Sequence, residues 1–514
     1  MTNIKEYNCH YCESEYEYAF IGFLETEGWK YTSGNKLSRV TKRDVLIEDD
    51  FKKFIADGNP DLTEDEVTQI YDTIRLVGAE SDFATLHKVY NWMVDGIQFT
   101  PKDGIARMIP LINFEKDGVK NIFRVVNQFT VEYTNNGQKE NRRPDVILFV
   151  NGMPLCIMEL KNPADANATI YDAWEQINIR YWRDIPHLLH YCPLACISDG
   201  VKTRLGTVRT PYEHFYAWRR VNDGDAVSTL PFAETETMIK GVYSPERFLE
   251  IFRDYIYFQD SIYISDEVEI VCRYPQFFAA RLLKQSIVDS VVTKSGRGGT
   301  YFGATGCGKT YTMAFLARQL ALRCTDISEI GSPTIILIVD RDELQKQGAK
   351  LFTKSTEFLN LGEVSVVKNR AQLRQELGAR QSGGFYICTI QKFCDREDDK
   401  IGLINDRQNI ICFSDEAHRT QLEHSKKIQF SKDADANMKA MVSKPYAKVL
   451  KEAFPQATFV GFTGTPIAET YQTFGDEIDR YTMDQAVADG LTVSIKYHPR
   501  IAKVLLDNNK IKEI

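Results

Sequence analysis

Gly303-Ala304-Thr305-Gly306-Cys307-Gly308-Lys309-Thr310 decides the fold of this chain, because it has the full spacing of a phosphate-binding loop. A short strand is expected to enter the loop, and residues 311–322 after it have apolar side chains at helical spacing. In this order, backbone N–H groups surround phosphates at a helix N-terminus, whose partial positive charge favours anions. The stretch therefore predicts binding of a nucleoside triphosphate with Mg²⁺. Thr305, Gly306 and Gly308 would line the loop, Lys309 would reach the β- and γ-phosphates, and the Thr310 hydroxyl would ligate the metal.

An acidic pair follows later in the chain, at the end of a predicted buried strand. Ile410–Ser414 is a nearly continuous apolar run, typical of a parallel strand that is covered on both faces. It ends in Asp415-Glu416, and the carboxyl ends of such strands are where open α/β sheets bind ligands. We expect Asp415 to hold the Mg²⁺, directly or through water, and Glu416 to polarise an attacking water.

Three further apolar runs look like neighbouring strands of the same sheet. Each ends in a small or polar group, so that four such groups would share one rim of the sheet. The sequence therefore predicts an α/β domain with a parallel sheet and a nucleotide site at its carboxyl rim. The three runs are Thr334–Val339, Phe385–Cys388 and Thr458–Phe462.

A second candidate site lies on a predicted β-hairpin ahead of the phosphate loop. Two apolar runs flank Asn151-Gly152, the strongest short-range hairpin signal. On the second strand Glu159 and Lys161 share a face, because they are two residues apart. A strict two-residue loop would place Asp145 on the other face. A bulged loop with Gly152 in the left-handed conformation would bring Asp145 diagonally beside Glu159, and we predict the bulged loop.

Three such groups on one face suit phosphodiester cleavage. Asp145 and Glu159 supply hard oxygen ligands for Mg²⁺, which activates water and stabilises charge on the phosphorus oxygens. Lys161 would orient the water or neutralise the developing negative charge. The alternative is a plain charge pair, since Glu-x-Lys is common on exposed strands. The apolar neighbours of Glu159 favour a functional pair, because buried charges without a partner or metal are costly.

The motifs at the carboxyl ends of the predicted parallel strands resemble those of the first RecA-like domain of superfamily 2 helicases. They are Val339–Leu344, Thr389–Phe393, Asp415-Glu416-Ala417-His418 and Thr463-Gly464-Thr465-Pro466. The resemblance implies that Gln276 recognises the adenine of ATP. It also implies that His418, Thr463 and Thr465 couple the nucleotide state to DNA contact. A simple alternative for Gln276 is a helix N-terminal residue that follows Pro275.

The hairpin residues Asp145, Glu159 and Lys161 resemble the PD-(D/E)xK pattern of restriction-endonuclease-like nucleases. That resemblance implies roles for Gln176 and Tyr181 on an amphipathic segment, although the four residues between them depart from the family's helix. Glu17, on a predicted N-terminal helix, matches an acid that these nucleases often add to the metal site. Its alternative is a solvated helix charge.

Both halves together resemble the restriction (R) subunit of type I restriction-modification enzymes. Besides the blocks above, Ile197–Gly200 and Phe413–Gln421 carry this resemblance. It implies ATP-dependent translocation and cleavage of double-stranded DNA, in a complex with modification (methyltransferase) and specificity subunits. Two other functions stay open: a superfamily 2 DNA motor or remodeller with a non-catalytic DNA-docking domain, and a non-catalytic assembly subunit.

The resemblance also predicts the domain organisation. We expect a restriction-endonuclease-like α/β nuclease domain over residues 1–240, a RecA-like parallel-sheet motor domain over 241–490, and the start of a second motor domain over 491–514. Because a domain needs at least ~50 residues, we expect a fragment of a longer protein that binds ATP weakly and does not translocate. Residues 35–110 match no motif.

Composition limits the remaining classes of protein. The chain has 514 residues, 43% of them apolar, and a net charge of −8, which argues against a uniformly basic surface but allows a basic groove. No 18-residue apolar run or signal peptide is visible, so we expect a soluble, cytoplasmic chain with no membrane partner. The 11 cysteines are expected to be reduced, and Cys9-His10-Tyr11-Cys12 has zinc-like spacing but no second pair.

Overall fold

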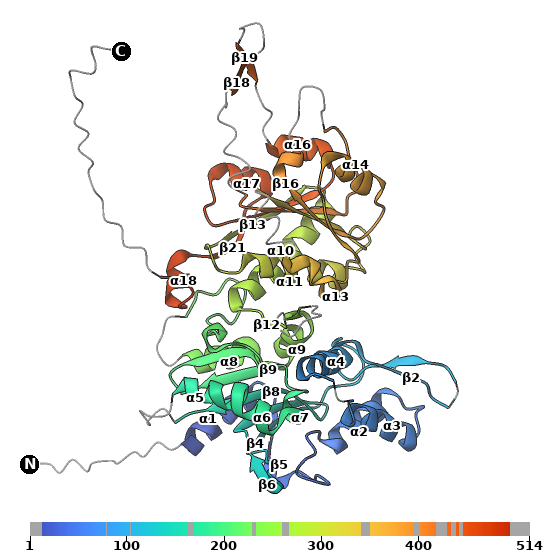
Figure 1. Cartoon of the computed structure of the whole chain (residues 1–514), viewed down its shortest axis with the longest axis vertical. Helices are drawn as coiled ribbons and strands as arrows, with labels where there is room; N and C mark the ends of the chain where they lie inside the picture. Colours follow the sequence, from blue (N-terminus) through green and yellow to red (C-terminus); the bar gives the residue numbers. More distant parts are fainter. Residues whose placement is uncertain are drawn as a thin grey trace, which may run out of the picture.

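Two large sheets organise the protein, one in each half of the chain, as Figure 1 shows from blue-green below to yellow-red above. Smaller two-stranded ribbons accompany them. The structure, a computed structural model, describes residues 13–78, 80–102, 104–162, 169–228, 233–259, 267–340, 350–393, 401–417, 429–432, 438–441 and 446–493. The ribbons are β2 (Ile97–Phe99) with β3 (Arg107–Ile109), β5 (Val131–Asn135) with β6 (Gln138–Arg142), β11 (Ile256–Phe258) with β12 (Glu269–Val271), and β18 (Gln429–Lys432) with β19 (Met438–Met441).

The N-terminal sheet holds six strands in the order β1-β4-β7-β8-β9-β10. Its central strands β7 (Val146–Val150) and β8 (Met153–Leu160) are buried at every position, because their continuous apolar runs are covered on both faces. The other strands are β1 (Lys30–Ser33), β4 (Phe123–Asn127), β9 (Leu194–Ser198) and β10 (Thr203–Thr207).

Helices cover both faces of this sheet. On one face α1 (Glu13–Thr26) meets α8 (Glu234–Val242), and the Tyr16 hydroxyl of α1 lies 2.7 Å from Ser198 Oγ and 3.3 Å from Thr235 Oγ1. Residues 35–110 supply three helices beside the sheet (Figure 1): α2 (Glu48–Gly58), α3 (Glu64–Arg75) and α4 (Asp82–Asp95). The other face receives the segment after β8, which forms α5 (Ile170–Glu175), the π-helical turn η2 (Gln176–Tyr181), α6 (Trp182–Asp184) and α7 (Pro186–Leu189).

The loop of the β7–β8 hairpin differs from the prediction. Val150 pairs directly with Met153, so that Asn151-Gly152 is a strict two-residue loop. Both loop residues have positive φ, 51° for Asn151 and 77° for Gly152, which is the combination that a tight hairpin with twisted strands requires. The predicted bulged loop is therefore wrong.

The extra residue lies inside the second strand instead. The pairing of β7 with β8 shifts by one position at Leu155, which is left opposite no residue of β7. Beyond this bulge Val146 pairs with Met158, so Asp145 comes opposite Glu159. The bulge thus achieves the juxtaposition of carboxylates that the loop was expected to achieve.

The C-terminal sheet holds seven parallel strands in the order β15-β16-β14-β17-β20-β13-β21. The four apolar runs predicted as strands are β14 (Thr334–Val339), β16 (Phe385–Thr389), β17 (Ile410–Asp415) and β20 (Thr458–Thr463), and the mixed and parallel α/β sheets confirm the predicted fold class. The other strands are β13 (Arg297–Gly303), β15 (Val364–Val366) and β21 (Glu477–Tyr481). The helices are α10 (Tyr274–Thr293), α11 (Lys309–Arg323), α13 (Thr356–Leu359), α14 (Arg370–Ala379), α16 (Tyr446–Ala453), α17 (Ala468–Phe474) and α18 (Met483–Ala488).

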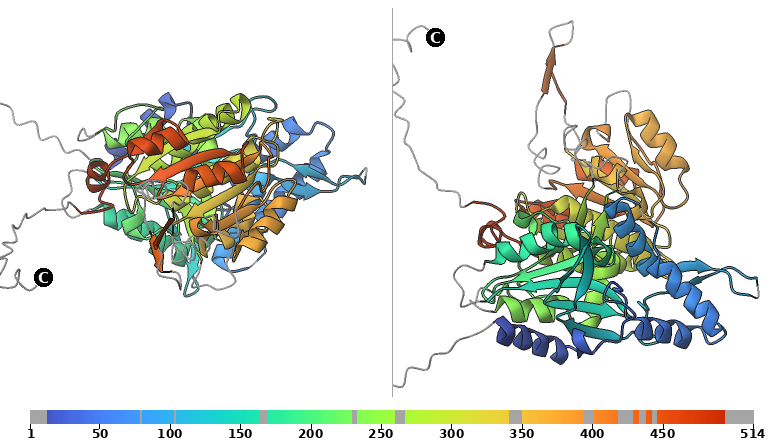
Figure 2. Two further views of the ribbon diagram at one scale, coloured as in Figure 1. Left: turned by 90° about the horizontal axis from the view of Figure 1, so that it is seen from above. Right: turned by 60° about the horizontal axis from the view of Figure 1, so that its bottom comes forward.

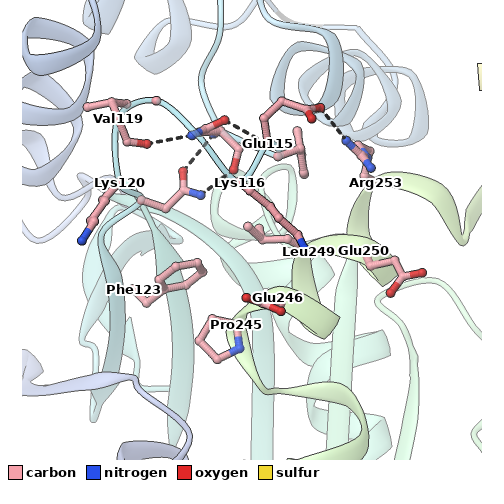
Figure 3. Close-up of a pocket in the computed structure, with 14 residues that line it drawn as sticks. Glu115, Lys116, Val119, Lys120, Phe123, Pro245, Glu246, Leu249, Glu250 and Arg253 are labelled. Carbon is pink, nitrogen blue, oxygen red and sulfur yellow. Dashed lines mark hydrogen bonds and ion pairs between the residues drawn. The ribbon is translucent and has the colours of Figure 1, made fainter. Parts of the chain in front are cut away.

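The two halves pack against each other around α9 (Pro245–Asp254), which lies between them in Figure 1. Figure 2 shows the whole chain from two further sides. Asp254 at the end of α9 is buried, and its Oδ1 accepts hydrogen bonds from Arg323 of α11 at 2.9 and 2.6 Å. On the other side of α9 a cavity of about 490 Å³ opens beside Phe123, next to the 3.3 Å ion pair of Glu115 with Arg253 (Figure 3).

Two predictions remain, on membrane-spanning helices and on a zinc-like cysteine spacing. Within the described ranges, none of the helices is both long and apolar enough to cross a membrane. The zinc-like Cys9-His10-Tyr11-Cys12 lies outside the described residues.

Candidate active sites

The first candidate site lies where β7 begins and β8 ends. Asp145 is 9% exposed, and its Oδ2 accepts a hydrogen bond from the backbone N–H of Leu160 at 2.9 Å. Glu159 is fully buried, and Lys161 Nζ lies 3.8 Å from its Oε2. The structure thus brings Asp145, Glu159 and Lys161 together at one end of the central hairpin.

The π-helical turn η2 completes this cluster with a chain of hydrogen bonds. The Tyr181 hydroxyl donates to Glu159 Oε1 at 2.7 Å, Gln176 Nε2 donates to the Tyr181 hydroxyl at 2.8 Å, and Lys161 Nζ donates to Gln176 Oε1 at 3.0 Å. A π-helix relates residues five apart, so it keeps Gln176 and Tyr181 on one face despite the four residues between them. The departure from the family spacing is therefore absorbed by the backbone.

The negative charges of Asp145 and Glu159 are only partly balanced by the single nearby ammonium of Lys161. The pKa of Glu159 is raised well above its ordinary value, first by burial and then by the charge of Asp145. Burial also raises the pKa of Asp145, although the Leu160 N–H and Lys161 act to lower it. Glu159 Oε2 is buried and has no hydrogen-bond partner. A divalent cation with oxygen ligands fits this pair, because it would offset both charges and satisfy the orphaned oxygen.

Glu17 is not brought into this pair. It is 4% exposed on α1, and its carboxylate accepts hydrogen bonds at 2.6 Å from the side-chain amides of Asn127 and Gln128. Asn127 pairs with Val146, and Val146 pairs with Met158, so these side chains share one face of the sheet. Side chains alternate between the two faces along a strand, so Glu159, next to Met158, lies on the opposite face from Glu17. Among the described residues no cluster of three or more acidic, His or Cys side chains that could hold a metal is present. The prediction that Glu17 adds to the metal site is therefore corrected, and so is its alternative as a solvated charge.

The second candidate site is the phosphate loop between β13 and α11. Gly306 and Gly308 both have φ of 83°, in the left-handed region that glycine adopts most readily, and Gly308 is the N-cap of α11. Lys309 Nζ donates to the Gly303 carbonyl at 3.2 Å and lies 3.8 Å from Glu416 Oε1. Thr305 is exposed in the loop and Thr310 is half-buried behind it.

The acidic pair faces this loop from the end of β17. Burial raises the pKa of Asp415 to about 6, even though the charge of Lys309 acts to lower it. Glu416 has a φ of 50°, and its N–H donates to Asp415 Oδ1 at 3.0 Å. A non-glycine residue in this conformation is strained, and such residues gather at functional sites. In this conformation the Glu416 carboxylate lies within 3.8 Å of the Lys309 ammonium.

Gln276 both caps a helix and contacts the phosphate loop. Its Oε1 accepts from the Arg273 N–H at 2.9 Å, which caps α10, and its Nε2 donates to the Gly308 carbonyl at 3.3 Å. Thr463 is buried at the end of β20, next to β13, and its Oγ1 accepts from the Thr465 N–H at 3.1 Å. These side chains therefore lie at the rim of the loop, while His418 lies outside the described residues.

Two residues that the sequence analysis missed lie near the loop: Arg273 beside Gly308, and Tyr216 next to Arg273. The Arg273 guanidinium lies 4.1 Å from the centroid of the Tyr216 ring, and its Nη1 is buried without a hydrogen-bond partner. Tyr216 belongs to the N-terminal sheet, because its backbone pairs with Leu205 of β10. Arg273 could have been suspected from its place three residues before Gln276, whereas nothing in the sequence relates Tyr216 to the phosphate loop.

Comparisons with known proteins match the two halves of the chain to two families. Residues 11–214 match the family described as the N terminus of type I restriction enzyme R proteins, and residues 275–514 match the SWI2/SNF2 ATPase family. The HindI endonuclease subunit, a type I restriction enzyme subunit of Haemophilus influenzae, is 30% identical over 94% of this chain and 46% of its own length. The putative MjaIXP endonuclease subunit of Methanocaldococcus jannaschii is also 30% identical, over 96% of this chain and 46% of its own.

A solved structure shows a weaker likeness. The fragment of a putative restriction subunit of a type I enzyme from Vibrio vulnificus is 16% identical, covers 71% of this chain and 56% of its own, and has a TM-score of 0.26. The chain spans just under half the length, 46%, of the two relatives above.

Proposed function

We propose that this chain, which belongs to the family of type I restriction enzyme endonuclease subunits, cuts double-stranded DNA at the Asp145–Glu159 pair. Within a subunit of the length of its relatives, ATP at the phosphate loop would drive translocation of DNA. The observation that carries the cleavage proposal is the orphaned Oε2 of Glu159 beside a second buried carboxylate. A fully buried carboxylate oxygen that accepts no hydrogen bond destabilises the fold, even with the Lys161 ammonium 3.8 Å away, so its presence here favours a bound ligand over a structural role.

Each side chain of the first site then has a distinct task. Asp145 and Glu159 would hold a Mg²⁺, which when bound supplies an activated water and neutralises charge on the phosphate. Tyr181 fixes one oxygen of Glu159 and leaves the other directed into the site. Lys161, held by Gln176, places an ammonium beside Glu159, where it can orient the water or stabilise the negative charge that develops at phosphorus.

The second site has the parts of an ATP-hydrolysing motor. Backbone N–H groups of the loop and the Lys309 ammonium would bind the phosphates, and Thr310 with Asp415 would hold the accompanying Mg²⁺. Glu416, turned toward Lys309, would polarise the attacking water. Gln276 is within hydrogen-bond reach of the loop and would contact the adenine, and Thr463 with Thr465 would pass the nucleotide state to DNA.

The proposal extends to the assembly and to the domain organisation. We place the nuclease domain at residues 1–240 and the first motor domain at 241–490, with modification and specificity subunits as partners in the cytoplasm. The matches of residues 11–214 and 275–514 to two different families support this division.

The test compares DNA cleavage and ATP hydrolysis in the same complex, assembled with its modification and specificity subunits. Asp145→Ala should abolish cleavage and keep the ATPase rate, whereas Lys309→Ala should abolish both, because cutting depends on translocation. Glu175→Ala removes a surface carboxylate, 35% exposed and paired with Arg180, and should change neither. Cleavage that survives in Asp145→Ala would place the nuclease elsewhere, and ATPase that survives in Lys309→Ala would refute the motor site.

A further inference from the structure

A second feature of the N-terminal half is a polar cavity of about 580 Å³ between the β5–β6 ribbon and the helical segment that follows Tyr181. One wall is the β5–β6 ribbon, which contributes Tyr133 and Arg142, and the opposite wall is the turn from α6 to α7. That turn contributes Arg183, Asp184 and His187, and Arg43 closes one side. None of these residues takes part in the proposed cleavage chemistry.

The cavity adjoins the cleavage site through both of its walls. Arg142 stands three residues before Asp145, and Asp184 stands three residues after Tyr181. Three residues of extended chain span at most ~10 Å, and three residues of helix bring side chains to within ~6 Å. These spacings place the backbones of Arg142 and Asp184 within about 10 Å of those of Asp145 and Tyr181. Since phosphates of one DNA strand follow at ~3.4 Å along the helix axis, this is a distance of about three nucleotides.

The positive charges of the cavity are only partly paired, and one buried ring nitrogen has no partner. Arg142 and Arg183 both bind the single carboxylate of Asp184, at 2.6 and 2.7 Å, so one negative charge faces two positive ones. His187 Nε2 is buried without a hydrogen-bond partner. The Arg43 guanidinium forms no ion pair within the described part of the chain. Burial and then the charge of Arg43 lower the pKa of His187 to about 4.

The second carboxylate that lines the cavity, Glu140, already has hydrogen-bond donors of its own. Glu140 accepts from the Tyr133 hydroxyl at 2.6 Å and from Asn135 Nδ2 at 2.8 Å, and the first of these bonds lowers its pKa. With three arginines against two carboxylates the lining is net positive. The excess positive charge of the cavity therefore suits an anion with several oxygen atoms.

We propose that this cavity binds a phosphodiester of the DNA strand a few nucleotides from the bond that is cut, with Arg43 and Arg183 as the contacting cations. This inference rests on the proposed nuclease function. Guanidinium groups bind phosphate oxygens in a bidentate manner, and such contacts set the position of DNA without reading its sequence. The cavity would thus hold the strand in register with Asp145 and Glu159.

A purely structural explanation covers only part of the lining. The Arg142–Asp184 pair fastens the β5–β6 ribbon to α6, and this role needs neither Arg43 nor the exposed Arg183, whose side chain is 65% accessible. Removing these two arginines therefore tests the ligand role without loosening the ribbon.

The experiment measures binding of a fluorescent duplex of about 20 base pairs to the chain over a series of salt concentrations. The double variant Arg43→Ala/Arg183→Ala should bind roughly tenfold more weakly at 0.1 M salt. The negative slope of log K against log[salt] should become shallower by about 1.8, or ~0.9 for each phosphate that an arginine no longer neutralises. The matched control Lys53→Ala/Lys240→Ala removes two exposed lysines that pair with Asp57 and Glu236, and it should leave both quantities unchanged.

Affinity and slope equal to wild type in the arginine variant would overturn the proposal, as would an equal loss in the lysine control. Cleavage by the assembled complex separates this result from the proposed function. If Asp145→Ala abolishes cleavage while the arginine variant binds DNA normally, the nuclease assignment stands and the phosphate site falls. If Asp145→Ala still cuts, the nuclease assignment falls, whatever the arginine variant does.

Discussion

Replacing Arg220 with alanine should loosen the joint between the two halves of the protein. Arg220 follows the N-terminal sheet and forms a bidentate pair with Asp479 of β21, with Nη1 and Nη2 each 3.0 Å from Oδ1. The two side chains are 7% and 8% exposed. Loss of one partner of a buried pair leaves an uncompensated charge, which lowers the free energy of unfolding by about 3–5 kcal/mol.

The loss should depend on pH, and its sign follows from Asp479. Burial holds the pKa of Asp479 above its ordinary value although Arg220 lowers it, so the Arg220→Ala variant should raise it further. An acid whose pKa is higher in the folded than in the unfolded state binds a proton on folding. Its contribution is fully present below the unfolded pKa and is lost as pH rises through the folded pKa. The deficit of Arg220→Ala relative to wild type should therefore be larger at pH 8 than at pH 5.5.

The assay is urea unfolding at the two pH values, followed by tryptophan fluorescence. Trp218 is 1% exposed, and its ring centroid lies 5.6 Å from that of Phe277 of α10, so it reports on separation of the halves. Arg480→Ala is the matched control, because Arg480 neighbours Asp479 but is 63% exposed and pairs with Glu477 at the surface, where an ion pair contributes less than about 1 kcal/mol. A deficit of Arg220→Ala below about 1 kcal/mol, or one that does not change with pH, would refute the reasoning.

Three further outcomes are expected. Tyr181→Phe removes the hydroxyl bonded to Glu159, so DNA cleavage should need roughly 10–100-fold more Mg²⁺ while the ATPase rate stays unchanged; an unaltered Mg²⁺ dependence would contradict the role of Tyr181. Because the pKa of Asp415 is about 6 and only the ionised acid can hold Mg²⁺, the ATPase rate should fall as pH drops through that region, and a rate that stays the same from pH 8 to pH 5 would count against it. Gly137→Ala should lower the free energy of unfolding by about 1–2 kcal/mol through its left-handed backbone alone, as its surroundings are open. Gly152→Ala has the same backbone but would also collide with a backbone carbonyl oxygen, so urea unfolding should show a clearly larger loss.

The parallel sheet could be predicted from sequence because its signal is local. A buried parallel strand needs a continuous apolar run, and β14, β16, β17 and β20 begin where the runs begin and end within one residue of their predicted ends. The phosphate loop is predictable for a similar reason, since glycines at fixed spacing determine the backbone that binds phosphate.

The geometry of the cleavage site was harder to predict, because it depends on two irregularities of the backbone. A bulge can lie anywhere along a strand, and apolar residues on both sides of Leu155 give no alternation that would locate it. The same applies to the π-helical turn, whose extra residue shows only as an unusual distance between Gln176 and Tyr181. The neighbours of Glu17 could not be predicted either, since Asn127 and Gln128 are more than a hundred residues away in the chain.

The contacts between the two halves bear on how the two sites act together. Asp479, the partner of Arg220, lies on β21 opposite Tyr301 of β13, the strand that enters the phosphate loop. Tyr216, stacked on Arg273 beside the same loop, is joined to β10 of the N-terminal sheet. The phosphate loop is thus held to the N-terminal sheet on two sides, through buried or stacked side chains that have little freedom to yield. If ATP drives motion as proposed, it should therefore displace other parts of the protein relative to this body, and the proposed nuclease site should move together with the phosphate loop rather than against it.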